Sequence, residues 1–338
     1  MLFTSAMASI QRRSFLGAGL GLAGGLAAGS PAAFAASAST PLDFSTARDN
    51  VYGFVKSYTS LSEKPVFGAF EGVQYAVIGK ERARPLFRFA GFGHLQGRIN
   101  ADGTADIRSK EVGLFLDLKS GEVIDTWENP WTGETVKVLP FYNEASNGHI
   151  PLEMPTFAMG TKKESTLMNE ADAKQNASGA APFIIPWRRI GDQYLFEWDY
   201  AHEYTNPVTP EGWPKASTGP RINPSEHFVF YVPAAALEDR AVLNPPLYSG
   251  FMRQGPWWPW MLMGQSGVDG VLLGRMHSHR ITGGLDEINP AVLARVRRDR
   301  PDLLEPPNSW TPAPIKDTWS YYASHVPPET PGYVITKG

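Results

Sequence analysis

The sequence predicts a mainly β protein built on a single antiparallel, barrel-like sheet with a few peripheral helices. Two observations support this prediction. Apolar and polar residues alternate over several stretches, as in half-buried strands. Turn-forming residues separate these stretches, in a chain with 33 glycines and 29 prolines. Many short antiparallel strands leave exposed edges unless the sheet closes or nearly closes, as in lipocalins. A two-sheet sandwich is the main alternative.

The N-terminal residues predict an export signal. An arginine pair, Arg12-Arg13, precedes a short, mildly apolar run, and Ala33-Phe34-Ala35 supplies the small-x-small pattern of a signal peptidase site. We expect residues 1–38 to be a cleaved twin-arginine signal peptide and residues 39–338 to be one β-rich domain. The expected partners during export are the twin-arginine translocase and signal peptidase, and the expected location is the periplasm, without a stable membrane anchor.

The composition excludes several kinds of site. The chain has no cysteine, so disulfides, thiolate metal ligands and a cysteine nucleophile are excluded. Residues 1–38 hold two arginines and no acids, so the mature chain would carry a net charge of −5, which gives no reason to expect nucleic-acid binding. With 42% hydrophobic residues, it can form a large core.

The predicted strands follow one another as hairpins. Val112, Leu114, Leu116 and Leu118 alternate with Gly113, Phe115 and Asp117. Turns are expected near residues 100–103, 119–122 and 131–134. Further strands are predicted at 183–190, 194–204, 227–232 and 271–281.

A few segments depart from the strand pattern. The spacing of apolar residues from Val51 to Leu61 predicts a helix capped by Ser45 or Thr46, and Ala291–Arg298 predicts another, capped by Asn289. A short helical piece is plausible at 257–263. The polar stretch at 161–180 is expected to be a surface excursion, and 301–338 an irregular strap.

The strand at 194–204 is the first candidate for a ligand site. Strict alternation would place one face of rings together: Tyr194, Phe196, Trp198, Tyr200, His202 and Tyr204. Aromatic walls with a few polar tips suit a small-molecule pocket. Ordinary aromatic core packing is the alternative.

The strand at 271–281 is the second candidate. It aligns Arg275, His277 and His279 on one face. Either histidine could act as a general base and Arg275 as a carboxylate clamp. A metal site would need a third ligand, with His202, His227, Glu203 or Glu226 as candidates. We therefore predict no metal site, and the cofactor stays unknown.

The third candidate is the cluster of Trp257, Trp258 and Trp260. These indoles could cap the mouth of a barrel, stack on a flat ligand or fill the core. The sequence lacks a nucleophile elbow, a phosphate loop and a zinc-protease helix motif.

Four segments together carry a family resemblance. They are Asn129-Pro130-Trp131-Thr132-Gly133-Glu134, Phe228–Val232, Trp257–Met263 and Pro306-Pro307. Over nearly the whole mature chain, the sequence resembles the domain-of-unknown-function family DUF1838. The resemblance implies an exported proteobacterial protein, and it supplies no reaction and no catalytic residue.

The sequence leaves three hypotheses about function. The first is a periplasmic hydrolase, lyase or isomerase that acts on a small aromatic or polycyclic substrate. In this hypothesis His277 or His279 is the base, Arg275 and His202 also belong to the site, and the Tyr/Trp face binds the rings of the substrate. The second is a non-catalytic binding protein for a hydrophobic small molecule. The third is a structural envelope protein. If both predicted faces meet in one cavity, the third fails.

Overall fold

The computed structural model describes residues 41–62, 64, 66–155, 180–201, 203–311 and 317–333. Backbone contacts separate Met1–Ala38 from Ser39–Gly338, and every described residue belongs to the second unit. The predicted signal peptide, nearly all of the predicted excursion at 161–180 and His202 lie outside the described residues. No helix within the described ranges is long and apolar enough to cross a membrane.

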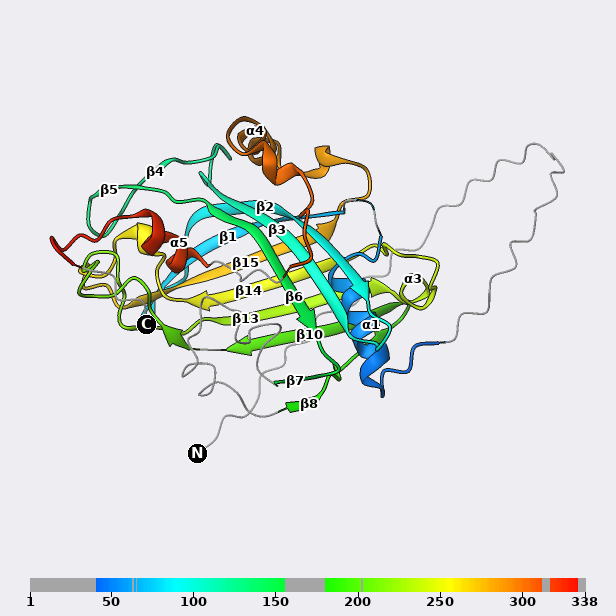
Figure 1. Cartoon of the computed structure of the whole chain (residues 1–338). Coiled ribbons are helices and arrows are strands. Elements are labelled where there is room, and N and C mark those ends of the chain that lie inside the picture. Colours follow the sequence, from blue (N-terminus) through cyan, green and yellow to red (C-terminus); the bar gives the residue numbers. More distant parts are fainter. Residues whose placement is uncertain are drawn as a thin grey trace, which may run out of the picture. The chain divides into compact units, whose positions relative to one another are not determined.

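One antiparallel sheet of nine strands forms most of the described chain (Figure 1). In spatial order its strands are β6 (Phe141–Ile150), β3 (Ala105–Leu116), β2 (Arg84–Ile99), β1 (Phe67–Ile78), β15 (Gly270–Arg280), β14 (Tyr248–Gly255), β13 (Ser225–Pro233), β10 (Gln193–Ala201) and β9 (Arg188–Ile190). Pairing of β1 with β15 joins the two halves of the chain. The predicted mainly β fold with one barrel-like antiparallel sheet is confirmed. Among the described strands, β6 and β9 remain edges, so the sheet is not a closed barrel.

Three pairs of short strands lie outside the main sheet. They are β4 (Thr126–Glu128) with β5 (Thr135–Lys137), β7 (Glu153–Pro155) with β8 (Ala180–Pro182), and β11 (Tyr204–Thr205) with β12 (Arg221–Ile222). Tyr204 therefore belongs to a strand separate from β10, which corrects the prediction of one continuous strand to residue 204. The predicted strand at 183–190 is also wrong except at its end, β9, because Pro186 cannot donate a ladder hydrogen bond.

Both predicted helices are present. Helix α1 (Ala47–Tyr58) has Thr46 as its N-cap, which accepts a hydrogen bond from the Asp49 amide. Helix α4 (Pro290–Asp299) has Asn289 as its N-cap, which accepts from the amides of Ala291 and Val292. The remaining helices are α3 (Ala234–Glu238), α5 (Thr318–His325) and the 3-10 turns η1 (Pro259–Met261), η2 (Leu285–Glu287) and η3 (Pro301–Leu304). Only η1 represents the predicted helical piece at 257–263.

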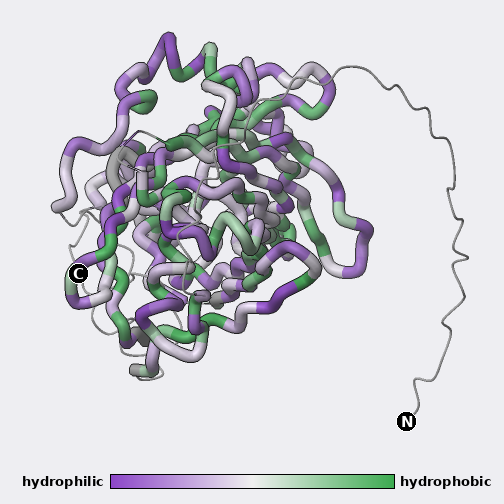
Figure 2. The backbone as a smooth tube through the Cα atoms, turned by 90° about the vertical axis from the view of Figure 1, so that its right-hand side faces the viewer, coloured by the Kyte–Doolittle hydropathy of each residue, from purple (hydrophilic) through white to green (hydrophobic). Residues whose placement is uncertain are grey.

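The two faces of the sheet have different coverings. Helix α1 packs on β2, β3 and β13 from one side, which we call the inner face. Helix α4 packs on the other side, the outer face, where it covers Ala90, Phe92 and Val112; it is drawn above the sheet in Figure 1. Figure 2 shows green, hydrophobic stretches running through the interior between purple, hydrophilic loops.

The inner face carries two separate hydrophobic cores. The α1 core packs Phe54, Val55 and Phe183 against Phe196 and Phe230. The tryptophan core lies toward the opposite ends of the strands and contains Phe87, Phe115, Trp213, Trp260 and Trp319. Partly buried rings continue from both cores toward the middle of the inner face: Tyr58 and Phe228 pack against the α1 core, and Phe89 packs against the tryptophan core.

The segment after η3 lies over the outer face, as a strap does. The Asn147 side-chain amide donates to the Ser309 and Thr311 carbonyls at 3.1 and 2.7 Å, and the Trp310 ring lies under the guanidinium groups of Arg98 and Arg108. This part of the strap covers the outer face, whereas α5, further along the chain, packs on the inner face, where Trp319 belongs to the tryptophan core.

Candidate functional site

A band of half-buried side chains crosses the inner face between the two cores. We call it the central zone, and its members are Tyr58, Phe70, Phe89, Glu111, Glu226, Phe228 and Phe251. They come from α1, β1, β2, β3, β13 and β14, so the zone exists only in the folded sheet. Large aromatic side chains that stay partly accessible in the middle of a curved sheet are suited to contact a ligand.

The strand register builds the aromatic part of the zone. One row of directly paired residues crosses seven strands: Trp198, Phe228, Phe251, Met276, Gly72, Phe89 and Phe115. The rings of Phe228 and Phe251 are 4.5 Å apart between centroids, and those of Phe89 and Phe115 are 4.9 Å apart. The row therefore presents apolar ring surface across most of the sheet.

Two glycines let these rings lie across the sheet. A Cβ atom on Gly91 would come within 2.4 Å of the Phe70 ring, and one on Gly113 within 2.2 Å of the Phe89 ring. Any larger residue at either position would push the ring away from the strand. The glycines thus explain how Phe70 and Phe89 fit over neighbouring strands, 5.6 Å from each other.

Among the mostly aromatic side chains of the central zone, Glu111 carries a carboxyl with a raised pKa. Burial, and secondarily the charge of Glu226, raises the pKa of the Glu111 carboxyl to about 7. Burial and the charges of Glu111 and Glu226 also raise the pKa of Tyr58, which keeps that phenol protonated. Within the described chain, Glu111 makes no hydrogen bond or ion pair. Near neutral pH its carboxyl therefore exists in both protonation states.

Glu226, whose charge helps to raise the pKa of Glu111, is part of a fixed ion pair. Arg253 Nε donates to Glu226 Oε1 at 3.0 Å, and the Arg253 guanidinium lies 4.6 Å from the Trp258 ring centroid and 5.3 Å from that of Trp319. Tyr204 donates a hydrogen bond to Asp317 at the edge of this cluster. The two rings and the carboxylate hold the guanidinium in one position.

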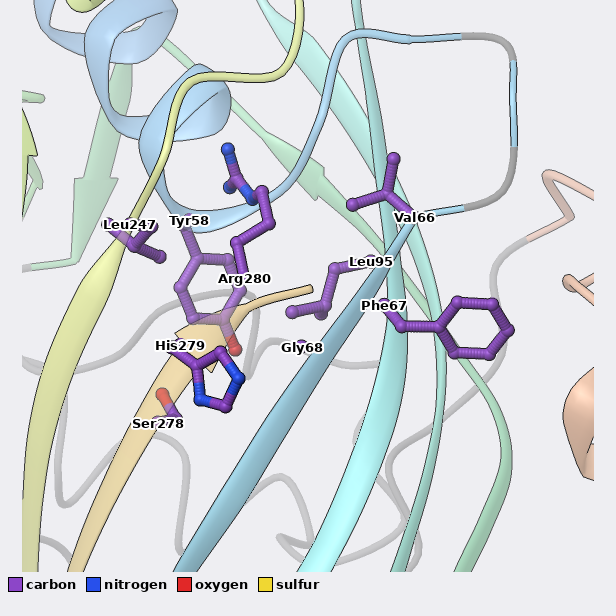
Figure 3. A pocket seen from close by; sticks show the side chains of 9 residues that line it. All are labelled: Tyr58, Val66, Phe67, Gly68, Leu95, Leu247, Ser278, His279 and Arg280. Carbon is purple, nitrogen blue, oxygen red and sulfur yellow. The ribbon is translucent and has the colours of Figure 1, made fainter. Parts of the chain in front are cut away.

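A small cavity of about 30 Å³ opens beside Tyr58 (Figure 3). Its lining includes Gly68, Leu95, Leu247 and Ser278. Arg280 points from this cavity toward the end of α1, where it donates to the carbonyls of Ser57, Thr59 and Pro245. The cavity is about large enough for one water molecule.

The predicted aromatic face of β10 does lie on the inner face, but it mostly packs against α1. Phe196 is buried, and the rings of Phe196 and Trp198 lie 5.9 and 5.2 Å from Phe54. The Tyr194 hydroxyl donates to Glu238 at 2.7 Å. Of this face, only Trp198 continues the aromatic row. The backbone of Tyr200 is in β10, while its side chain and all of His202 lie outside the description.

The predicted site on β15 needs correction. Arg275, His277 and His279 share one face as expected, but the register pairs His279 with Ala69, which packs under α4. These three residues therefore lie on the outer face, opposite the aromatic face of β10, and the two predicted faces do not meet. His279 instead lies 3.4 Å from Glu287. Alternation fixes which residues share a face and not which face looks inward.

Trp257, Trp258 and Trp260 are buried in the tryptophan core, where they act as core residues. Trp258 also borders the proposed site through its contact with Arg253. In the described ranges, no group of three or more acidic or histidine side chains could hold a metal ion.

Sequence reasoning missed Glu111 and Arg253 as site residues and named Glu226 only as a possible metal ligand. One signal was available for Glu111: it alternates in phase with Gly113 and Phe115, which puts a carboxylate on a face of rings and glycines. The pairing of Glu226 with Arg253 depends on strand register, which sequence alternation does not give.

A family model described as "Protein of unknown function (DUF1838)" matches residues 63–326. No curated protein matches the chain. Among solved structures, a crystal structure of MucB in complex with MucA(peri) aligns at 12% identity, covering 73% of this chain and 97% of that chain, with a TM-score of 0.12. A Pseudomonas aeruginosa MucA/MucB complex aligns at 11% identity over 74% and 96% of the two chains, with a TM-score of 0.10. Likeness at this level carries no argument about fold or function.

Proposed function

The chain belongs to the DUF1838 family, and from the geometry of its inner face we propose that it binds a small, flat, mainly apolar molecule in the central zone and exchanges a proton with it through Glu111. The observation that carries this proposal is Glu111 itself. A carboxyl that titrates at about 7 among aromatic rings is matched to general acid–base catalysis near neutral pH.

The rings supply the binding. Phe228 and Phe251 form a tilted ring pair on one side of the zone, and Phe70 and Phe89 form another on the side of β1 and β2. These rings are only half-buried, so a flat ligand would cover apolar surface that now contacts water. Such coverage is worth about 25 cal/mol per Å² before the cost of association.

A neutral fluorescent probe, N-phenyl-1-naphthylamine, tests the binding step. We expect the folded protein to enhance its fluorescence and Phe251→Ala to weaken binding about tenfold, because the variant removes one ring of the pair. The matched control is Tyr248→Ala, since Tyr248 is on the same strand, faces outward and is 64% exposed. Equal affinity in wild type and Phe251→Ala, with circular dichroism unchanged, would refute binding in the central zone.

The chemical step is tested with 5-nitrobenzisoxazole, a flat neutral molecule that opens to a coloured phenolate when a base removes its ring proton. We expect a rate that rises with pH through about 7 and is lost in Glu111→Gln. Glu197→Gln, an exposed carboxylate on β10, should leave the rate unchanged. If the neutral probe binds but no Glu111-dependent rate appears, the protein is a non-catalytic binding protein, the second candidate that the exposed rings favour.

We also propose that the protein works in the periplasm after twin-arginine export. The support is the order of three sequence features: Arg12-Arg13, the mildly apolar run that follows, and Ala33-Phe34-Ala35. Folding before export would deliver the assembled inner face intact.

A further inference from the structure

We propose that the ligand of the central zone carries a carboxylate, and that Arg253 binds it through the N–H groups that Glu226 leaves free. This inference rests on the proposed function, because it concerns the same ligand. It names the chemical class, an apolar ring system with an attached carboxylate.

Arg253 has the hydrogen-bonding capacity for this role. A guanidinium has five N–H donors. Among the described residues, Arg253 donates only through Nε, to Glu226. The four hydrogens on its two terminal nitrogens make no protein hydrogen bond there. Neither terminal nitrogen is sealed from solvent, and the side chain is 10% exposed, so water reaches them.

Arg253 is also held in place before any ligand arrives. Its guanidinium lies over Gly255, where a Cβ would come within 2.9 Å of Nη1, and against the rings of Trp258 and Trp319. A planar guanidinium that is fixed by stacking presents paired donors to a carboxylate at little cost in side-chain entropy. A lone lysine could not offer this geometry.

The charges around the zone couple such binding to protonation. Glu111 interacts electrostatically with Tyr58 from α1 and with Glu226 from β13, and Glu226 in turn is paired with Arg253 from β14. Because Glu226 already balances Arg253, a bound carboxylate adds one uncompensated negative charge beside Glu226, whose own charge already helps to raise the pKa of Glu111. Ligand binding should therefore favour protonated Glu111, and affinity should fall as pH rises through about 7.

Displacement of N-phenyl-1-naphthylamine by 2-naphthoate and by 2-naphthamide tests the inference, since the two ligands share a ring system and differ in charge. At pH 6, wild type should prefer naphthoate at least tenfold, and Arg253→Met should lose the preference while still binding the neutral probe. The preference should shrink several-fold between pH 6 and pH 8 in wild type and stay constant in Glu111→Gln.

A second variant covers the case in which Arg253→Met does not fold. Gly255→Ala should displace the guanidinium and reduce the naphthoate preference while the arginine remains. Wild type that binds the probe but does not distinguish the two ligands would overturn the inference, as would a preference retained in the variant that folds. Failure of wild type to bind the probe at all would instead count against the proposed function.

Discussion

At the scale of single residues, the buried carboxyl of Glu111 costs folding free energy and supplies a group for the proposed proton transfer. Glu111 is a carboxyl in apolar surroundings, where its charged form loses hydration without gaining a hydrogen bond from the described residues. A glutamine of the same shape would avoid that cost. Arg253 differs, since a carboxylate and two aromatic rings compensate its burial. Uncompensated burial of this kind is typical of groups that act on a ligand.

The buried Glu111 carboxyl predicts that the stability of the fold depends on pH. The Glu111 pKa rises from its ordinary 4.5 to about 7 on folding, so the folded state holds the proton more tightly. The free energy of unfolding should therefore fall as pH rises from about 4.5 to 7, by about 3 kcal/mol from this group, and stay level above that range. Urea unfolding at pH 5 and pH 8 should show Glu111→Gln losing this part of the dependence. A pH profile parallel to wild type would contradict it.

At the scale of elements, the end of α1 is fixed by one side chain from β15. The last carbonyls of a helix have no partners within the helix, and here Arg280 donates to those of Ser57 and Thr59. Its burial lowers the pKa of the Arg280 guanidinium, yet four carbonyl contacts surround it. This contact also positions Tyr58, the last residue of α1, at the central zone.

Replacing Arg280 with methionine should lower the free energy of unfolding by about 3 kcal/mol, because it leaves buried carbonyls without donors. The same substitution at Arg275 is the control, since Arg275 is exposed on the outer face of the same strand, and it should change stability by less than about 0.5 kcal/mol. Denaturant titration of the two variants measures both effects. Equal losses would show that the buried contacts do not stabilise α1.

Some of these elements and faces could be predicted from the sequence, and others could not. Local signals located α1, α4 and the long strands, because capping and alternation act between near neighbours. They also grouped Arg275, His277 and His279 correctly on one face. They could not decide that this face lies outside, because that depends on the pairing of β1 with β15 across about 200 residues of chain.

At the scale of the whole domain, the sheet joins two meanders at one seam. The meander β6-β3-β2-β1 meets β15-β14-β13-β10-β9 only through β1 and β15, and α1 contacts strands of both. Each half contributes to the central zone: β1 to β3 bring Phe70, Phe89 and Glu111, and β13 and β14 bring Glu226, Phe228 and Phe251. The candidate site therefore assembles only when both halves pair. No local stretch of sequence could therefore predict it. If the chain were secreted unfolded, the two halves would have to pair after transport.

The proposed export of a folded domain predicts that the arginine pair of the leader is required. A twin-arginine translocase recognises the arginine pair itself, so lysine at Arg12 and Arg13 should block delivery although the charge is unchanged. The matched control replaces Arg297 and Arg298, an exposed pair in α4, with lysine and should leave delivery intact. Fractionation of a bacterial host followed by blotting measures the mature chain in the periplasm. If the leader variant arrives at wild-type levels, the protein either uses an unfolded route or stays independent of the arginine pair, and its two halves must then pair after transport.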